Sequence, residues 1–198
     1  MKTRLAKNIG TRFAQELYTR FITDMLNTLK KCGKDIIISV SDAERVADVG
    51  KWLGREYIFA AQQGAALGER MSNAFSEVFD SGYENAIIVG SDLPDLPLYF
   101  VESAFAELSG NDIVIGPSTD GGYYLVGFKH TGFNSEIFAG IEWSTDKVFA
   151  QTMKQAEKLG LSVHVLPQWN DVDDIEGLKM FFARNKDAKY AVIRAAVL

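Results

Sequence analysis

The sequence has few of the residues that build disulfide, metal or membrane-spanning scaffolds. It contains one cysteine and two histidines in 198 residues, and these small numbers argue against a zinc site. Cys32 has no second cysteine to pair with, so we interpret it as a packing or surface thiol. No apolar run reaches membrane-spanning length, and the first residues are basic and polar rather than signal-like. We therefore expect a cytoplasmic protein without a membrane span.

Positive charge is also scarce. The formal net charge is -5 at pH 7 and the sequence pI is near 5.1, which argues against a nucleic-acid-binding protein. A local basic cluster can still bind the phosphates of a small ligand. Hydrophobic residues make up 47% and charged residues 24%, an ordinary globular composition. The length suits a single domain over residues 1–198, and the sequence indicates no oligomeric state.

Predicted strands and helices alternate along the chain. Apolar, β-branched runs predict strands over residues 36–40, 57–60, 86–89, 112–115, 123–128 and 162–166. Helical spacing and caps predict helices over residues 11–32, 42–53, 69–79, 97–108 and 144–159, and from 175 onward. This alternation predicts an α/β fold with a mostly parallel sheet and helices on both faces.

The segment from Ala86 to Pro97 is the one around which we organise the rest. Ala86-Ile-Ile-Val89 suits a strand buried on both faces, and Asp92 follows where that strand would end. Open α/β folds bind ligands at the carboxyl ends of their strands. The alternative is a loop in which Asp92 or Asp95 caps the next helix, with Pro97 in that helix's first turn.

Asp92 is one of three candidate metal ligands. Asp171 and Asp173 lie on the same side of the chain if their segment is extended. Carboxylates bind hard divalent ions such as Mg²⁺ or Mn²⁺, which also take phosphate oxygens and waters. We expect Asp92 and Asp171 or Asp173 to hold one such ion. A helix cap at Asp173 or Asp174 is the alternative, and the two roles can coexist.

Two other segments contain candidate phosphate-binding groups. Lys2 and Arg4 offer an ammonium and a guanidinium that can hold a diphosphate, although a solvated basic tail has the same composition. Gly64 and Gly68 permit close backbone approach, and Gly68 stands at the start of a helix whose free N–H groups attract anions. Arg70 follows on that helix. The alternative is an ordinary helix start with a solvated Arg70.

Asp120-Gly-Gly-Tyr-Tyr is the least ordinary string in the chain. Its glycines suggest a backbone that bends tightly around a ligand, with Tyr123 or Tyr124 as a wall and Asp120 as a general base. The alternative is a hairpin-like turn with tyrosines in the core. Trp143 is most simply an apolar anchor, and Ser144 or the threonine after it a helix cap. Their hydroxyl and N–H groups could instead hold an anion.

Several strings, in this order, resemble those of a known family. They are Lys2-Thr-Arg-Leu5, Leu67-Gly-Glu-Arg-Met71, Gly90-Ser-Asp-Leu-Pro94, Gly116-Pro-Ser-Thr-Asp-Gly-Gly-Tyr-Tyr-Leu125, Trp143-Ser144 and Asp171-Val-Asp173. Together they resemble the DUF2064 family of candidate nucleotide-diphospho-sugar transferases, which is related to the MobA-like and phospholactate nucleotidyltransferases. The resemblance implies a GT-A-type, Rossmann-like fold with three αβα layers, and a divalent cation.

The resemblance also implies roles for individual residues. Lys2 and Arg4 would match the basic phosphate loop of the family. Asp92 would match its metal-binding acid after the central strand, and Asp171 and Asp173 its second metal carboxylate. These assignments agree with the candidates that the residues suggest by themselves.

The sequence departs from the family pattern at its start. The family's first strand and its glycine–proline loop, which precede the Lys-Thr-Arg string, are missing from this sequence, so residues 2–4 are expected to lie in a loop. Residues 189–198 are apolar enough to replace that strand, although their alanine content favours a helix.

We therefore expect a metal-dependent glycosyltransferase with a nucleotide-diphospho-sugar donor and a small-molecule or glycan acceptor. Gln62 and Ser91 are expected to help form the nucleotide pocket with the glycines and basic residues above. Asp92 and Asp120 are the expected catalytic residues. One alternative is a nucleotidyltransferase that joins a nucleoside triphosphate to a phosphorylated small molecule. Another is a nucleotide-binding domain without turnover.

Overall fold

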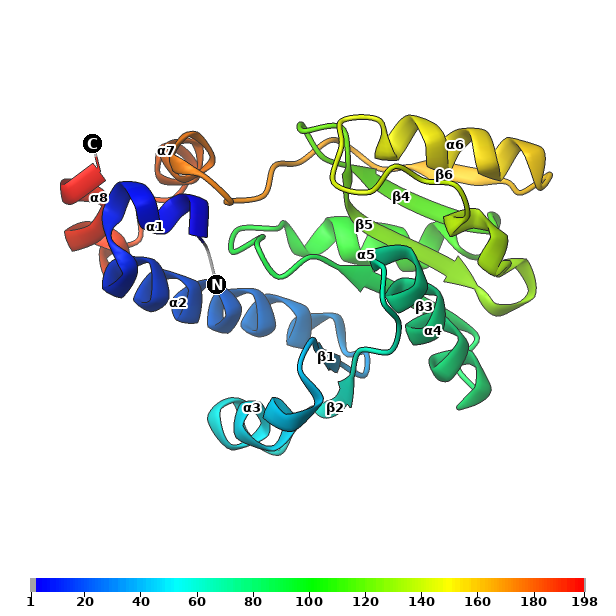
Figure 1. The fold of residues 1–198 in the computed structure, drawn as a ribbon, viewed down its shortest axis with the longest axis horizontal. Coiled ribbons are helices and arrows are strands. Elements are labelled where there is room, and N and C mark those ends of the chain that lie inside the picture. Colours follow the sequence, from blue (N-terminus) through cyan, green and yellow to red (C-terminus); the bar gives the residue numbers. More distant parts are fainter. Residues whose placement is uncertain (1–2, 198) are drawn as a thin grey trace.

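Helices and strands alternate through residues 3–197, which are the residues described by the computed structural model (Figure 1). The helices are α1 (Thr3–Ile9), α2 (Thr11–Leu29), α3 (Val46–Leu53), α4 (Leu67–Asp80), α5 (Leu98–Glu107), α6 (Val148–Lys158), α7 (Ile175–Arg184) and α8 (Ala191–Val197). The strands are β1 (Ile37–Val40), β2 (Ile58–Ala61), β3 (Asn85–Val89), β4 (Ile113–Pro117), β5 (Tyr123–Lys129) and β6 (Val163–Val165). The predicted strands and helices are all present, and the predicted α/β class is confirmed.

The strands form two sheets. Strands β1 and β2 pair in parallel, and the other sheet has the order β3-β5-β4-β6. Strand β5 is antiparallel to both β3 and β4, whereas β4 and β6 are parallel. Strands β3, β4 and β6 therefore run in one direction and only β5 runs in the other, which agrees with the predicted mostly parallel arrangement.

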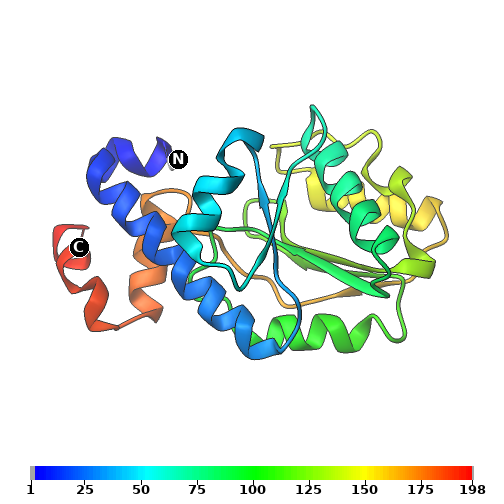
Figure 2. The ribbon, with the colours of Figure 1, turned by 90° about the horizontal axis from the view of Figure 1, so that it is seen from below.

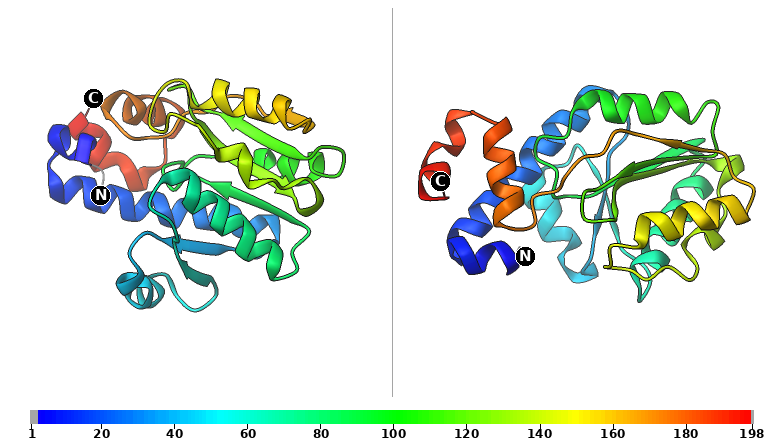
Figure 3. Two further views of the ribbon diagram at one scale, coloured as in Figure 1. Left: turned by 45° about the vertical axis from the view of Figure 1, so that its right-hand side comes forward. Right: turned by 90° about the horizontal axis from the view of Figure 1, so that it is seen from above.

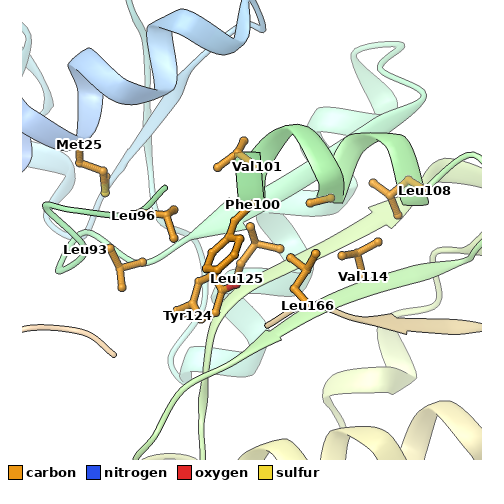
Figure 4. Close-up of a cluster of buried hydrophobic side chains, with 11 residues drawn as sticks. Met25, Leu93, Leu96, Phe100, Val101, Leu108, Val114, Tyr124, Leu125 and Leu166 are labelled. Carbon is orange, nitrogen blue, oxygen red and sulfur yellow. The ribbon is translucent and has the colours of Figure 1, made fainter. Parts of the chain in front are cut away.

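Helices cover both faces of the four-stranded sheet, as Figure 2 shows for α5 on one face and α4 with α6 on the other. Side chains alternate between these faces, so Val114 packs toward α5 while Ile113 and Ile115 pack toward α4 and α6. On the α5 side, the Phe100 ring stacks on Tyr124 at 6.0 Å between centroids (Figure 4). The three-layer αβα arrangement is therefore confirmed for this sheet.

A helical cluster forms the other end of the molecule (Figure 3). Helices α1, α2, α7 and α8 contribute buried apolar side chains to one core, including Leu5, Phe21, Phe181 and Ile193. The Phe21 and Phe181 rings meet edge to face at 5.1 Å. Val172, which precedes α7, belongs to the same core, so this cluster fixes the segment that contains the predicted acidic pair.

The first and last described segments of the chain are helical. Thr3–Ile9 form α1, so Arg4 lies in a helix and the expected loop at this position is wrong. Ala191–Val197 form α8, as their alanine content favours, and they do not replace a strand. No helix within residues 3–197 is both long and apolar enough to cross a membrane.

Strand β3 differs from its predicted environment. Its apolar sequence predicts burial on both faces, yet all five of its residues are partly exposed. By contrast, most residues of β4 and β5 are buried. The reason is position, because among the strands within residues 3–197 β3 pairs only with β5 and lies at the edge of its sheet.

The loop after β3 is held by an ion pair rather than by helix capping. Pro97 occupies the cap position of α5 with no side-chain cap, so the alternative in which Asp92 or Asp95 caps this helix is wrong. Asp95 instead accepts from Arg184 Nε at 2.8 Å and Nη2 at 3.3 Å. The Arg184 guanidinium also lies 4.7 Å from the Trp169 ring centroid. Arg184 therefore ties α7 to the carboxyl end of β3.

Replacing Arg184 with Met is expected to destabilise the protein by about 2 kcal/mol, because it leaves the Asp95 carboxylate, 13% exposed, without its bidentate partner. Lys179→Met on the same helix is the control. Lys179 pairs with Glu176 in solvent, so this change is expected to cost less than about 0.5 kcal/mol. Urea unfolding of both variants measures the difference, and equal losses would contradict this role of Arg184.

Candidate functional site

The candidate site lies where β3 and the segment before α7 meet. The Val172 amide donates to the Asp92 carbonyl at 2.9 Å, and Val172 itself is fully buried. Asp171 and Asp173 flank Val172, so this hydrogen bond brings all three predicted acids to the carboxyl end of β3. The hydroxyl of Ser91, the residue before Asp92, donates to Asp92 Oδ1 at 3.4 Å.

Arg4 joins this acidic group from helix α1. Its Nη1 donates to Asp173 Oδ2 at 3.2 Å, with both side chains substantially exposed. The predicted basic and acidic strings, which are 169 residues apart, are therefore adjacent. Lys2, the other predicted phosphate-binding residue, lies outside the described residues.

The three acids can be compared with the ligand set that a divalent cation needs. Within residues 3–197 there is no group of three or more acidic, histidine or cysteine side chains that could hold a metal ion by themselves. Magnesium commonly binds through one or two carboxylates and completes its shell with substrate phosphates and waters. Asp92 with Asp171 or Asp173 has the donor chemistry of such a site, and Arg4 lies beside these acids through its ion pair with Asp173.

A large cavity opens beside these acids. Its volume is about 1460 Å³, more than the roughly 300–1,000 Å³ typical of small-ligand pockets. The predicted site residues that line it are Arg4, Gln62, Arg70, Ser91, Asp120, Tyr123, Tyr124, Trp143 and Ser144. Gly64, Gly68, Asp92, Asp171 and Asp173 are not among its lining residues. The cavity therefore brings most of the predicted nucleotide and acceptor residues together, with the acids at its border.

Sequence reasoning missed several polar groups of this cavity, among them Tyr18 and Arg45. Tyr18 of α2 lines it and shares a hydrogen bond with Ser91 at 3.2 Å between the oxygens. Burial, together with the nearby Asp92 charge, raises the pKa of Tyr18, so its hydroxyl stays protonated. Arg45 also lines the cavity, after β1. A basic residue just after a predicted strand was a usable signal for Arg45, whereas nothing local distinguishes Tyr18.

The loop before α4 is held by side chains of the helix. Arg70 Nε donates to the Gly64 carbonyl at 3.0 Å, and the Glu69 carboxylate accepts from the Ala65 and Ala66 amides at 2.8 and 3.3 Å. These amide hydrogen bonds lower the pKa of Glu69. Arg70 therefore orders this loop and lines the cavity at the same time.

Acid is expected to loosen this loop. The pKa of Glu69 is lowered in the folded state, so the ionised carboxylate stabilises the folded loop. This stabilisation is fully present above the ordinary carboxyl pKa of about 4.3 and is lost as pH falls through the lower folded pKa. Faster amide hydrogen exchange at Ala65 on acidification, corrected for intrinsic rates, would report the loss. A Glu69→Gln variant, which has no carboxyl to titrate, should lack this pH dependence. The same dependence in both would contradict the assignment.

Gly68 lies in the first turn of α4 and packs against a side chain, while its predicted close approach to a bound ligand stays a prediction. A Cβ added to Gly68 would stand 2.8 Å from the Trp143 ring. The absent side chain therefore makes room for the indole, which also meets Tyr123 edge to face at 6.5 Å. Gly68 acts by seating the aromatic wall of the cavity.

Asp120 forms part of a tight turn. Its Oδ1 accepts from the Gly122 amide at 3.0 Å and from the Ser118 hydroxyl. Gly121 has φ +89°, and the Phe149 amide donates to its carbonyl at 2.9 Å. The turn is therefore fastened to the start of α6. Asp120 itself is exposed, with one carboxylate oxygen engaged in the turn.

The two adjacent tyrosines have different environments. Tyr123 is half-buried, and its hydroxyl contacts the Met71 sulfur at 3.9 Å. Tyr124 is 4% exposed, belongs to the core under α5 and donates to the Pro167 carbonyl at 3.0 Å. Burial raises the pKa of both hydroxyls. Tyr123, which faces Trp143, fits the predicted wall better than Tyr124, which matches the alternative of a core tyrosine.

The segment after Trp143 does not cap α6 as predicted. Lys147 occupies the cap position and makes no side-chain cap. Ser144 has φ +64°, a left-handed conformation uncommon outside glycine, and it lines the cavity. By contrast, the prediction for the last helix is confirmed at Asp174, which accepts from the Gly177 amide at 2.9 Å and caps α7.

Comparisons with known proteins agree with this fold. A solved structure of a candidate nucleotide-diphospho-sugar transferase from Desulfovibrio desulfuricans G20 is 40% identical, with a TM-score of 0.90 over 96% of this chain and 83% of its own. A 2-phospho-L-lactate guanylyltransferase of Methanocaldococcus jannaschii is 25% identical over 94% of this chain and 79% of its own. The molybdopterin-guanine dinucleotide biosynthesis protein A of Archaeoglobus fulgidus, 13% identical, shares the fold with a TM-score of 0.50 over 83% of this chain and 74% of its own.

The family comparison covers the centre of the chain. Residues 25–145 match the family described as "Uncharacterized protein conserved in bacteria (DUF2064)". The match includes Asp92 and the Asp120 turn, and it confirms the resemblance that the sequence strings indicate. The chain therefore belongs to the DUF2064 family.

Proposed function

We propose that this chain is a transferase that uses a nucleotide substrate, and specifically a metal-dependent glycosyltransferase with a nucleotide-diphospho-sugar donor. The observation that carries the proposal is the hydrogen bond from the Val172 amide to the Asp92 carbonyl, because it unites the acids beside a large cavity. The relative from Desulfovibrio desulfuricans supports the donor class by its name and its 40% identity.

The side chains around the cavity divide into binding and reacting groups. Arg4, Arg45 and Arg70 line the cavity alongside several aspartates, and their guanidinium groups have the geometry that binds a donor diphosphate. Trp143 and Tyr123 offer apolar surface to the less charged part of a substrate. Hydrogen bonding to the turn orients Asp120.

In the proposed reaction, an acceptor hydroxyl oxygen forms a bond with the anomeric carbon of the donor sugar, and the bond from that carbon to the diphosphate breaks. Asp120 accepts the hydroxyl proton, and the nucleoside diphosphate leaves. Asp92 with Asp171 or Asp173 would hold Mg²⁺ or Mn²⁺, which when bound supplies positive charge for the diphosphate. Because the fold holds donor and acceptor side by side, no covalent enzyme intermediate is required.

The test begins with binding. A thermal-shift panel of UDP-glucose, GDP-mannose and GTP, each with and without Mn²⁺, should show a rise in melting temperature for a nucleotide sugar that depends on the ion. The ligand that stabilises the protein is then incubated with candidate acceptors, and released nucleoside diphosphate is measured. No stabilisation by any nucleotide with or without metal would contradict the proposal.

Nucleotidyl transfer is a second candidate, favoured by the guanylyltransferase of Methanocaldococcus jannaschii, which matches 94% of this chain. Here a substrate phosphate oxygen would attack the α-phosphorus of a nucleoside triphosphate, and pyrophosphate would leave. Released pyrophosphate therefore distinguishes this reaction from glycosyl transfer. Binding that is indifferent to metal and to Asp92→Asn, without either product, would indicate a nucleotide-binding domain.

A further inference from the structure

Tyr18 is a polar residue on the side of α2 that faces the large cavity. The α2 residues that line this cavity recur at helical spacing and include Gln15, Tyr18, Ile22, Leu26 and Leu29. Toward the carboxyl end of α2 this side is apolar, whereas Tyr18 places a hydroxyl beside the loop that follows β3. The proposed reaction gives this hydroxyl no role.

The position of Tyr18 is fixed by its neighbour in the chain. Leu17 is fully buried in the helical core, in the same cluster as Val172, and α2 extends from this core toward the sheets (Figure 1). A close-packed core of this kind does not let α2 slide or rotate past the segment before α7. Because Leu17 and Tyr18 are adjacent on one helix, the core that places Val172 also places the Tyr18 hydroxyl.

The hydroxyl of Tyr18 begins a chain of hydrogen bonds that ends on Asp92. Tyr18 Oη and Ser91 Oγ are 3.2 Å apart, and Ser91 Oγ donates to Asp92 Oδ1 at 3.4 Å. An ionised carboxylate only accepts hydrogen bonds, and a hydroxyl has one hydrogen to donate. Because Ser91 donates its hydrogen to Asp92, it accepts the hydrogen of Tyr18. The chain therefore has one direction, from Tyr18 through Ser91 to Asp92.

Asp92 is thus held at two points. Its carbonyl accepts from the Val172 amide at 2.9 Å, and its carboxylate accepts from the Ser91 hydroxyl that Tyr18 orients. The first contact fixes the backbone, whereas the second acts on the side-chain torsions. Carboxylates that bind metal ions are commonly oriented by such hydrogen bonds from behind. The chain from Tyr18 has the form of this support.

The length of the Ser91–Asp92 contact sets the expected size of the effect. At 3.4 Å it is longer than the roughly 2.5–2.7 Å of a strong hydroxyl–carboxylate hydrogen bond, so it orients Asp92 more than it stabilises the charge. Loss of a group that supports a metal ligand lowers metal affinity about 10- to 100-fold. For Tyr18, which acts through a second hydroxyl, we expect the lower end of this range.

We propose that Tyr18 is a positioning residue for Asp92, which it orients toward a bound divalent cation through the Ser91 hydroxyl. Tyr18 touches neither the ion nor the reacting atoms in this arrangement. This role rests on the proposed metal binding by Asp92, and it extends the candidate site to helix α2. It is the same for glycosyl transfer and for nucleotidyl transfer.

The test measures Mn²⁺ binding to the full chain by water-proton relaxation, which requires no turnover. Tyr18→Phe removes the hydroxyl and keeps the ring, and Ser91→Ala removes the middle of the chain of hydrogen bonds. Each change is expected to weaken Mn²⁺ binding about 10-fold. The double variant should bind Mn²⁺ no more weakly than Ser91→Ala, because Tyr18 acts only through Ser91.

Tyr83→Phe is the matched control. The Tyr83 hydroxyl donates to Asp35 Oδ2 at 2.8 Å, near the amino ends of β1 and β3 and not at the carboxyl end of β3. This change also removes one hydrogen-bonded tyrosine hydroxyl, and it should leave Mn²⁺ affinity unchanged. Both tyrosine variants should melt within about 2 °C of the unchanged chain.

Turnover gives a second measurement. Tyr18→Phe should raise the Mn²⁺ concentration that gives half of the maximal rate about 10-fold, because the ion binds more weakly. The rate at saturating Mn²⁺ should change less than about 2-fold, because a variant that binds the ion has the same groups at the reacting atoms. An equal fall in rate at all Mn²⁺ concentrations would overturn the positioning role.

The binding experiment separates failure of this role from failure of the proposed function. Unchanged Mn²⁺ affinity in Tyr18→Phe, or additive losses in the double variant, would overturn the role of Tyr18 alone. Weaker binding together with a melting temperature more than about 2 °C below that of Tyr83→Phe would assign Tyr18 to stability and overturn it as well. If the unchanged chain binds no Mn²⁺, the proposed metal role of Asp92 is wrong, and the role of Tyr18 falls with it.

Discussion

Replacing Asp92 with Asn is expected to lower kcat/KM at least about 100-fold, with a change in melting temperature below about 2 °C. The side chain is partly exposed, and the contact that unites the site uses the Asp92 carbonyl, which Asn retains. The lost charge is the one that would hold the divalent ion, and such ions supply several kcal/mol of charge stabilisation. Product release, as nucleoside diphosphate or pyrophosphate, measures the loss at several Mn²⁺ concentrations.

Asp174→Asn is the matched control for this prediction. Asp174 is an exposed acid in the neighbouring segment, and its side chain caps α7 through the Gly177 amide. Asparagine is an equally good cap, so this variant should keep both stability and activity while removing the same charge. If both variants lose activity equally, the loss reflects the removal of one negative charge from this region rather than the loss of a metal ligand. If Asp92→Asn remains fully active, the metal role of Asp92 is wrong.

Local structure was predictable wherever one segment carries its own pattern. The β-branched run in 36–40 and the 3.6-residue spacing from Phe13 to Leu29 each specify a strand or a helix without distant partners. The order of these elements then leads to an α/β fold with helices on both faces. The exception is Arg4, whose helix α1 packs on α2 and α7, contacts that a short basic string does not reveal.

The candidate site was predictable in composition but less so in its contacts. Asp92 and Val172 meet through backbone groups, and side-chain identity alone does not indicate that bond. Arg184 and Asp95 are 89 residues apart, so their pairing depends on the position of α7 after the fold has formed. The tyrosine pair shows the same limit, because only the packing of β5 decides which ring enters the core.

The edge position of β3 was not predictable from its own residues. Ala86–Val89 has the composition of a central strand, yet strand order decides whether a neighbour covers the second edge. Sequence and structure therefore disagree here in an informative way. The composition of β3 matches a strand with neighbours on both sides, whereas the order of the described strands places it at an edge.

The largest expected effect on stability comes from Gly121→Ala. Gly121 has φ +89°, and an added Cβ would stand 2.1 Å from the Asp146 carbonyl oxygen, which is backbone and cannot turn aside as a side chain can. Conformational strain and overpacking together should cost about 3 kcal/mol. In a chain of this length the melting temperature should fall by roughly 6–12 °C.

Gly82→Ala separates the two causes. Gly82 has a similar φ of +93°, but a Cβ added there would meet no atom within 4 Å, so this variant carries the backbone strain alone. We expect it to cost about 1–2 kcal/mol and to leave activity unchanged. Gly121→Ala should also reduce activity. The added Cβ pushes the Asp120 turn away from Asp146 and strains the hydrogen bond from the Phe149 amide to the Gly121 carbonyl, which fastens the turn to the start of α6. Equal losses of stability in the two variants would mean that the turn moves away from Asp146 freely, and the orientation of Asp120 would then not depend on this contact.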